Sequence, residues 1–386
     1  LRASVAKVGS DLNPYQLALL YSVGSDQWNG NIVTGTPNEL VDPKIQPALS
    51  SAKEAGMDLR FLRNRFGLSA TYYQEDKRNE ILSVPISGAS GFTSKKINAG
   101  RIQRSGIELS LDGTVIKAGD FSWDLTLNWS RNRSKIIELV EGIDAVAQPG
   151  ANDAFGLAYV YNVVGKPWGQ LRGYGITRDD QGRPVLDDGG FYIPEQNKDL
   201  GSVLPNFIGG IINQMRYKNF GLSFNIDYQS GGKFFSLSDV NGTFSGLTQR
   251  TAGLNDKGIP VRDPVSEGGG VHVTGVNENG ESVDTYVDAK LYYQQWLNSG
   301  IAENSIYDLT FIKLREVNLS YQIPVSKLGK LGNYLTNASF SLVGRNLWLI
   351  KSNVRDFDPS EISGTFGENG QFPGTRSYGF NLKLSF

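Results

Sequence analysis

The sequence predicts an all-β fold, a transmembrane antiparallel β-barrel of about ten strands with long extracellular loops. Two patterns support this class. Several segments alternate between large apolar and small or polar residues, and the connections between them alternate between tight turns and long loops. The composition agrees, with 46 Gly among 386 residues and 11% aromatic residues, yet only 39% hydrophobic residues. A transmembrane barrel has such a moderate hydrophobic fraction because only one face of each strand contacts lipid.

The composition also excludes several kinds of chemistry. The chain has no Cys and one His, His272, which excludes disulfides, thiolate metal sites and two-histidine zinc sites and argues against a catalytic triad. A net charge of −1 gives no reason to expect nucleic-acid binding. Asp187, Asp188 and Asp199 could hold calcium, but their spacing matches no EF-hand loop. We therefore expect no enzyme, no cofactor and no metal site.

The last segment shows the alternation most clearly. From Tyr378 every second residue is apolar, and those between are small or polar, which predicts a strand with two unlike faces. The last strand of a soluble β-protein would show the same alternation of apolar and polar residues. Terminal strands of outer-membrane barrels resemble the same pattern, which the barrel-assembly machinery reads. The apolar residues of this expected assembly signal are Tyr378, Phe380, Leu382, Leu384 and Phe386.

Ten segments are predicted to be strands because they carry this alternation. They are residues 1–8, 56–62, 66–74, 99–112, 120–132, 205–217, 219–230, 306–323, 337–348 and 375–386. Tight turns at residues 63–65, 113–119 and 218 and a moderate connection at 324–336 alternate with long loops. The loops are residues 9–55, 75–98, 133–204, 231–305 and 349–374. Outer-membrane barrels have short periplasmic turns and long extracellular loops, so we expect both ends of this segment to be periplasmic.

Three segments depart from the simple pattern. Around residues 308–315 the alternation is irregular, with Lys313 and Arg315 in phase with Val317, which predicts a bulge or a strand that projects above the membrane. Residues 157–177 could form a further hairpin but are assigned to loop structure. Residues 288–297 are predicted to form a short surface helix.

The two faces of the strands carry different expected roles. Trp123 and Trp129 lie on the predicted lipid face, toward opposite ends of one strand, as interfacial aromatic residues would. Charged residues on the other face are expected to point into the lumen, where they would line the path or, as the favoured alternative, contact a plug. These residues are Arg104, Glu108, Asp112, Asp124 and Asp227.

Aromatic residues in the predicted extracellular loops are candidates for contact with a ligand or a partner. Aromatic faces stack on sugar rings and are enriched at binding surfaces. The alternative, which we favour, is that they pack long loops together. The candidates are Trp28, Trp168, Phe234, Phe235, Tyr292, Tyr293 and Trp296.

Several short segments, each weak alone, carry a family resemblance through their order and spacing. They are residues 1–9, 13–15, 101–109, 165–169, 204–210, 217–220, 311–321, 344–347 and 358–361. Together they resemble the C-terminal half of the barrel in the SusC/RagA group of TonB-dependent outer-membrane transporters. The resemblance covers essentially all of the chain.

This resemblance implies a plugged barrel of about 22 strands, of which residues 1–386 would be the C-terminal portion of a TonB-dependent receptor barrel. The plug domain and the TonB box would lie outside this chain, as would contact with TonB-ExbB-ExbD. The resemblance further implies the outer membrane of a Gram-negative bacterium, contact with its lipid, and a SusD-like surface lipoprotein as partner. It also allows a dimer of such pairs.

The implied function is TonB-dependent import of nutrient oligomers, either oligosaccharides or peptides. One alternative is a SusC-like subunit that serves as a structural scaffold in a larger outer-membrane assembly. Another is a self-contained ten-stranded barrel, such as a small porin or adhesin. The sequence leaves the substrate open, because specificity would lie in loop geometry, in the lipoprotein and in the remaining half of the barrel.

Overall fold

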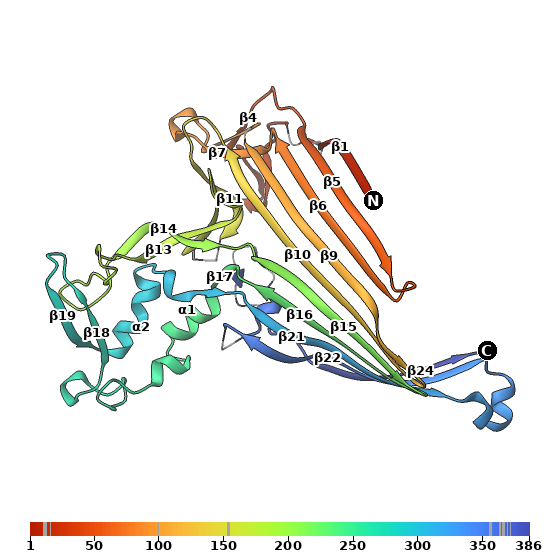
Figure 1. Ribbon diagram of the computed structural model, residues 1–386. Helices are drawn as coiled ribbons and strands as arrows, with labels where there is room; N and C mark the ends of the chain where they lie inside the picture. Colours follow the sequence, from red (N-terminus) through yellow and green to blue (C-terminus); the bar gives the residue numbers. More distant parts are fainter. Residues whose placement is uncertain are drawn as a thin grey trace. The chain divides into compact units, whose positions relative to one another are not determined.

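The computed structural model describes residues 1–10, 14–15, 17–98, 100–152, 155–354, 357–362, 364, 367–368, 370 and 372–386. Most of these residues lie in β-strands (Figure 1). The α-helices are α1 (Leu237–Phe244) and α2 (Ala289–Asn298). Neither helix in this described part of the chain is long and apolar enough to cross a membrane. Asn13 and Ala99, which belong to a resembling segment and to an expected strand, lie outside the described residues.

The largest sheet has ten strands, as the alternation predicted. They are β1 (Arg2–Ser10), β5 (Ala48–Phe61), β6 (Phe66–Arg78), β9 (Arg101–Ala118), β10 (Phe121–Glu138), β15 (Phe207–Tyr217), β16 (Phe220–Ser230), β21 (Phe311–Ile323), β22 (Asn337–Ser352) and β24 (Ser377–Ser385). Their order in the sheet is their order along the chain, with β1 and β24 at its two ends. Among the described strands, β1 pairs with β5 and β24 pairs with β22, and the order does not join β1 to β24 as the alternative of a self-contained ten-stranded barrel would require.

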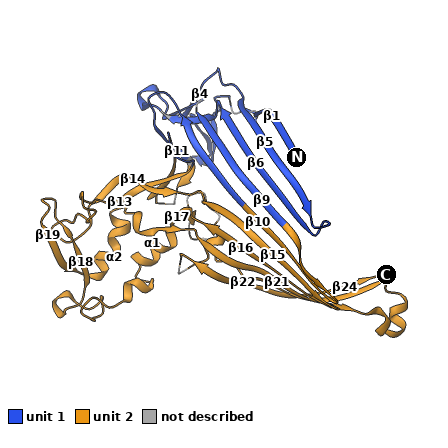
Figure 2. Ribbon diagram, viewed as in Figure 1, with its two compact units in different colours: residues 1–111, 130–149, 162–168 blue, residues 112–129, 150–161, 169–386 orange. Residues whose placement is uncertain are grey.

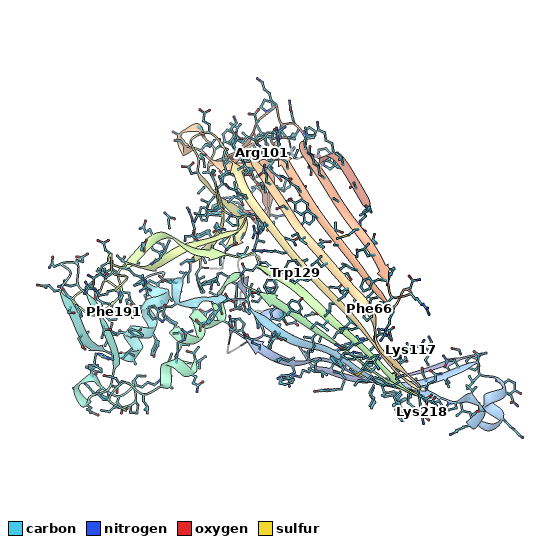
Figure 3. The ribbon with its side chains drawn as sticks, viewed as in Figure 1. Phe66, Arg101, Lys117, Trp129, Phe191 and Lys218 are labelled. Carbon is cyan, nitrogen blue, oxygen red and sulfur yellow. The ribbon has the colours of Figure 1, made fainter. Side chains whose placement is uncertain are left out.

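Some strand bounds differ from the expected ones. The segment expected at 56–62 begins at Ala48, because β5 pairs with β6 as far as Leu49 opposite Arg78. Residues 48–55 are mostly small or charged and show no apolar period, so the pairing of the neighbour decides their structure. The segment expected at 306–323 is divided into β20 (Ile306–Asp308) and β21. The expected tight turn is confirmed at Lys218, which has a φ of 50° and joins β15 to β16 (Figure 3).

The irregularity near Arg315 is a β-bulge, as predicted. Asn225 of β16 faces Glu316 and the next residue, Ile226, faces Leu314, which leaves Arg315 as the extra residue of β21. A bulge shifts the alternation by one position. Leu314 therefore shares the apolar face with Val317 despite their odd spacing, and Lys313 falls on the polar face.

The chain divides into two compact units, and each is described by itself (Figure 2). Unit 1 comprises residues 1–111, 130–149 and 162–168. Its smaller sheet has the order β4-β8-β7, and β2 and β3 form a separate hairpin. The bounds are β2 (Ser22–Trp28), β3 (Asn31–Gly35), β4 (Glu39–Val41), β7 (Ile81–Pro85) and β8 (Ser94–Asn98). The core of this unit contains Val84, Ile102, Ile136, Leu139 and Val146.

Unit 2 comprises residues 112–129, 150–161 and 169–386 and carries the two α-helices and several short strands. The short strands of the remaining sheets are β11 (Ala145–Asn152), β12 (Ala158–Val163), β13 (Gln170–Ile176), β14 (Pro194–Ser202), β17 (Lys233–Ser236), β18 (Val271–Val276), β19 (Ser282–Val287) and β23 (Gly367–Glu368). Residues 145–149 of β11 and 162–163 of β12 are assigned to unit 1. The segment 157–177 thus forms a hairpin, β12–β13, in a four-stranded sheet apart from the large one. Its assignment to a loop rather than to the large sheet, which we call the wall, is confirmed.

Side-chain caps begin both α-helices. The hydroxyl of Ser236 accepts the N–H of Asp239 at α1, and the carboxylate of Asp288 accepts the N–H of Leu291 at α2, which satisfies donors that the helix itself cannot. The short helix predicted at 288–297 is confirmed by α2. The 3-10 turns are η1 (Gly88–Ser90), η2 (Gln249–Ala252), η3 (Val265–Glu267), η4 (Glu303–Ser305), η5 (Val325–Lys327), η6 (Gly329–Asn333) and η7 (Pro359–Glu361).

Candidate functional site

The large sheet presents an apolar face in unit 2 that is lined with aromatic rings. The ring centroids of Trp129 and Phe207 lie 6.3 Å apart, and those of Phe220 and Tyr321 lie 4.8 Å apart. Phe220 remains more than half exposed, as do several other large apolar residues of this face. Exposed apolar side chains along consecutive strands form the surface that lipid contacts in an outer-membrane barrel. The interfacial roles of Trp123 and Trp129 remain predictions.

The polar face carries ion pairs and hydrogen bonds between neighbouring strands. Arg104 lies 3.2 Å from a carboxylate oxygen of Glu75, and Asp124 accepts a hydrogen bond of 2.6 Å from Thr114. Two further predicted residues of β9, Glu108 and Asp112, lie an even number of positions from Arg104 and so share its face. Their contact with a plug or a transport path remains a prediction.

A buried cation joins β21 to the segment that follows β22. The side chain of Lys313 is 1% exposed, and its ammonium group donates to the carboxylate of Asp358, to Ser360 at 2.9 Å and to Glu361 at 3.1 Å. Beside it, Arg315 bridges Glu361 at 3.0 Å and Asp227 at 2.7 Å. We call residues 357–361, which include η7, the anchor segment.

These contacts bring together two segments that carried the family resemblance, residues 311–321 and 358–361. Burial alone would raise the pKa of Asp358. The hydrogen bonds from Lys313 and Ser360 outweigh burial, so the pKa of Asp358 lies below its ordinary value. Asp358 is therefore ionised at neutral pH and neutralises the buried ammonium group. The bulge at Arg315 makes this possible, because it turns Lys313 to the polar face.

A second carboxylate, that of Glu368 in β23, holds the start of α1. It accepts the N–H of Ser238 at 2.7 Å and the hydroxyl of Ser238 at 2.8 Å. A negative charge at a helix N-terminus is favourable, because it meets unpaired N–H groups and the positive end of the helix dipole. Phe235 of β17 pairs with Gly367 beside it. The residues after η7 are thus tied to the helical part of unit 2.

The structure separates the seven aromatic candidates into groups. Phe234, Phe235 and Trp296 are 1%, 0% and 3% exposed. Phe234 packs against the rings of Tyr307 and Phe357, with centroid distances of 5.8 and 5.5 Å. These three side chains pack the loops of unit 2, which is the favoured alternative of the sequence analysis, and their buried faces are closed to a ligand. Contact of these three residues with a ligand or partner stays a prediction, one that their burial does not favour.

The other four candidates each occupy a different kind of position. Trp168 packs against the core of unit 1, while Trp28 on β2 is 74% exposed. Tyr292 lies edge-on to Trp296 with ring centroids 5.3 Å apart, and burial raises the pKa of Tyr292 well above its ordinary value. Tyr293 lines a cavity of about 450 Å³ between α1 and α2. Contact with a ligand or partner therefore remains a prediction for Trp28 and Tyr293.

Acidification is expected to loosen the loop part of unit 2 through Glu303. Burial alone would raise the pKa of Glu303. The N–H of Ile176 at 2.7 Å and the cations of Arg178 and Lys198 outweigh it and lower the pKa below the ordinary 4.5. A carboxylate with a lowered pKa stabilises the fold above the unfolded-state value, and this stability is lost as pH falls through the folded-state pKa. Wild-type protein should therefore lose more stability between pH 7 and pH 3 than Glu303→Gln.

Thermal unfolding of both proteins at the two pH values measures this difference. The Asp180→Asn variant is a control, since Asp180 lies in the same loop region and is exposed. Equal losses in wild type and Glu303→Gln would contradict the assigned role of Glu303.

Comparison with known proteins gives the family. A family model described as "TonB dependent receptor-like, beta-barrel" matches residues 1–202. The chain belongs to this family. TonB-dependent receptors of this kind are outer-membrane proteins, and the family is one of receptors and transporters rather than enzymes.

Relatives of this TonB-dependent receptor include one from Formosa agariphila, which is 28% identical over the whole chain and over 40% of its own length. The TonB-dependent receptor SusC of Bacteroides thetaiotaomicron is 27% identical over 45% of this chain and 18% of its own. The structure of the RagAB peptide transporter superposes with a TM-score of 0.70 and 19% identity, over all of this chain and 40% of its own, which shows a shared fold. The chain thus spans about 40% of the length of the Formosa receptor.

Proposed function

We propose that this chain is the C-terminal part of the barrel of a TonB-dependent importer of nutrient oligomers, either peptides or oligosaccharides. The observation that carries this proposal is the large sheet of consecutive strands, apolar and exposed on one face and charged on the other. A lipid-facing wall around a polar passage needs these two faces. The family match and the RagAB fold likeness support the same function.

The two ends of the sheet support a larger barrel. Every residue of β1 is exposed, and β24 is exposed over all but its last residue. Unpaired edge strands template pairing with other strands, and a closed barrel removes them. We propose that β1 and β24 pair with further strands of the same protein in a barrel of about 22 strands. The plug and the TonB box would belong to the remaining part, through which TonB-ExbB-ExbD would act.

The proposed partner is a SusD-like surface lipoprotein that covers the extracellular mouth. The likeness to SusC and RagAB supports this pairing, and a dimer of such pairs is part of the same proposal. The exposed Trp28 on the β2–β3 hairpin is a candidate contact, because large aromatic side chains concentrate at interfaces.

Two experiments test this function: purification of the protein from native outer membranes, and uptake of labelled substrates by cells. We expect an intact mass well above the 42.3 kDa of this chain, with a lipoprotein in the same complex. We also expect uptake of labelled peptides or oligosaccharides to stop in cells that lack TonB. A large assembly without TonB-dependent uptake of either class would favour the scaffold instead.

A further inference from the structure

A shallow cavity of about 600 Å³, open to solvent, lies on the polar face of the large sheet within unit 2, where the anchor segment meets the sheet. Strands β16, β21 and β22 contribute its walls, and the residues just before β24 close one side. Its lining residues are Asn225, Arg315, Glu316, Arg345, Asn346, Glu361, Pro373, Gly374 and Thr375. Two arginines, two glutamates and two asparagines face this space, and none of these lining residues is aromatic.

A second bulge shapes the cavity. Glu316 of β21 faces Arg345 of β22, whereas Leu314 faces Trp348, so two residues of β22 stand opposite Arg315. The first of the two, Asn346, has a φ of 57°, a left-handed conformation that few residues other than Gly adopt. Asn adopts this conformation more readily than most residues other than Gly. Bulges are over-represented next to functional sites, where they re-aim a side chain. Here the bulge directly follows Arg345.

Asn346 holds this arrangement through one end of its amide. Its Nδ2 donates to the carbonyl of Thr375 at 3.1 Å, which fixes the orientation of the amide. Its Oδ1 is buried and has no hydrogen-bond partner among the described residues. Gly374 packs closely over the same amide, since a Cβ atom there would lie 3.0 Å from Nδ2. A buried acceptor without a partner is rare in native structures and calls for an explanation.

Arg345 is the accessible cation of the cavity. Its side chain is 67% exposed, and its Nε donates to Glu316 at 2.8 Å. A guanidinium carries five N–H donors in a planar fork, and the contact with Glu316 orients this fork through one of them. Carboxylates bind such a fork through two parallel hydrogen bonds.

We propose that this cavity binds the carboxylate end of an oligopeptide. Arg345 would bind the carboxylate, and the side-chain amide of Asn225 would bond the neighbouring peptide unit. Asn346 is a positioning residue, because it holds the bulge that presents Arg345. The balanced charges match a peptide, whereas an oligosaccharide would be expected to stack on aromatic rings. The inference rests on the proposed function and names the substrate class for it.

The site is tested by measuring the affinity of two matched peptide mixtures for the full-length protein. The protein is purified from native outer membranes together with its partners. Both mixtures contain octapeptides without Asp or Glu; one has free carboxyl ends and the other is amidated. We expect wild type to prefer the free carboxyl ends by about tenfold, the effect of one charge-assisted contact. Arg345→Gln should lose this preference. Arg216→Gln is the control, because Arg216 is also exposed and lies near the end of β15, a strand of the same sheet that does not pair with β22.

The role of Asn346 is tested by the same ratio of affinities for free and amidated peptides. A general structural defect would weaken the binding of both mixtures and leave this ratio unchanged. Gly adopts a positive φ without strain, so Asn346→Gly should keep the preference and Asn346→Ala should reduce it. If wild type binds peptides but Arg345→Gln shows the same preference for free carboxyl ends, the proposed carboxylate site is wrong. The proposed import function is not affected by that result. The same holds if wild type imports only oligosaccharides, or if the cavity proves to be filled by the protein's own plug. If uptake of neither class depends on TonB, the proposed function itself fails.

Discussion

Replacing Lys313 with Met is expected to release the anchor segment from β21 at a cost of about 3–5 kcal/mol in the free energy of local opening. The ammonium group of Lys313 is fully buried and holds Asp358 and Glu361 together. Without it Asp358 loses its buried cation, whereas Glu361 keeps its contact of 3.0 Å with Arg315. Hydrogen exchange of residues 357–361, followed by mass spectrometry, measures the opening directly.

Two further variants sharpen the Lys313 test. Lys290→Met is the control, because Lys290 is exposed at the start of α2 and should leave exchange unchanged. Adding Asp358→Asn and Glu361→Gln to Lys313→Met removes the uncompensated charges and should recover part of the lost protection. Unchanged exchange in the Lys313→Met protein would show that the buried cation does not hold this segment.

The second large effect is expected from Phe235→Ala. Phe235 is fully buried and packs with Val160, Leu171 and Val240 in the core that joins β12, β13, β17 and α1. Truncation of a buried Phe leaves a cavity and costs about 3–5 kcal/mol. We expect faster hydrogen exchange throughout β17 and α1 and a lower unfolding temperature for the loop part of unit 2.

An exposed loop residue and two strands of the large sheet provide the controls for Phe235→Ala. Leu247→Ala removes an apolar side chain that is 82% exposed and should leave exchange as in wild type. Protection of the paired strands β15 and β16 should stay unchanged in Phe235→Ala. A loss of protection there as well would mean that the loop core and the wall unfold together.

The wall was predictable because its signal is local. A strand with one apolar and one polar face repeats every two residues, and each large side chain of β16, from Phe220 to Tyr228, reports its own face. The first half of β5 escaped prediction, because its small and charged residues carry no such period and depend on pairing with β6. The irregular phase of Lys313 and Arg315 did predict the bulge.

The contacts of the loops were beyond sequence reasoning, because they join distant residues without a repeating pattern. Lys313 and Asp358 are 45 residues apart, and nothing in either segment shows that they meet. Likewise, Phe235 and Trp28 are both aromatic residues in long loops, yet one is buried and the other exposed. A fixed period distinguishes such cases in strands, and these loops have none.

The consecutive order of the large sheet bears on how this protein can diversify. Residues 139–206 separate β10 from β15, and residues 231–310 separate β16 from β21, yet each pair of strands lies side by side. The entropy of closing a loop grows slowly, by about 0.6 kcal/mol for each doubling of length. The length of an insertion therefore places little constraint on the pairing of the strands beside it. Because these two insertions share the buried core around Phe235, we expect them to diversify together while the large sheet keeps its register.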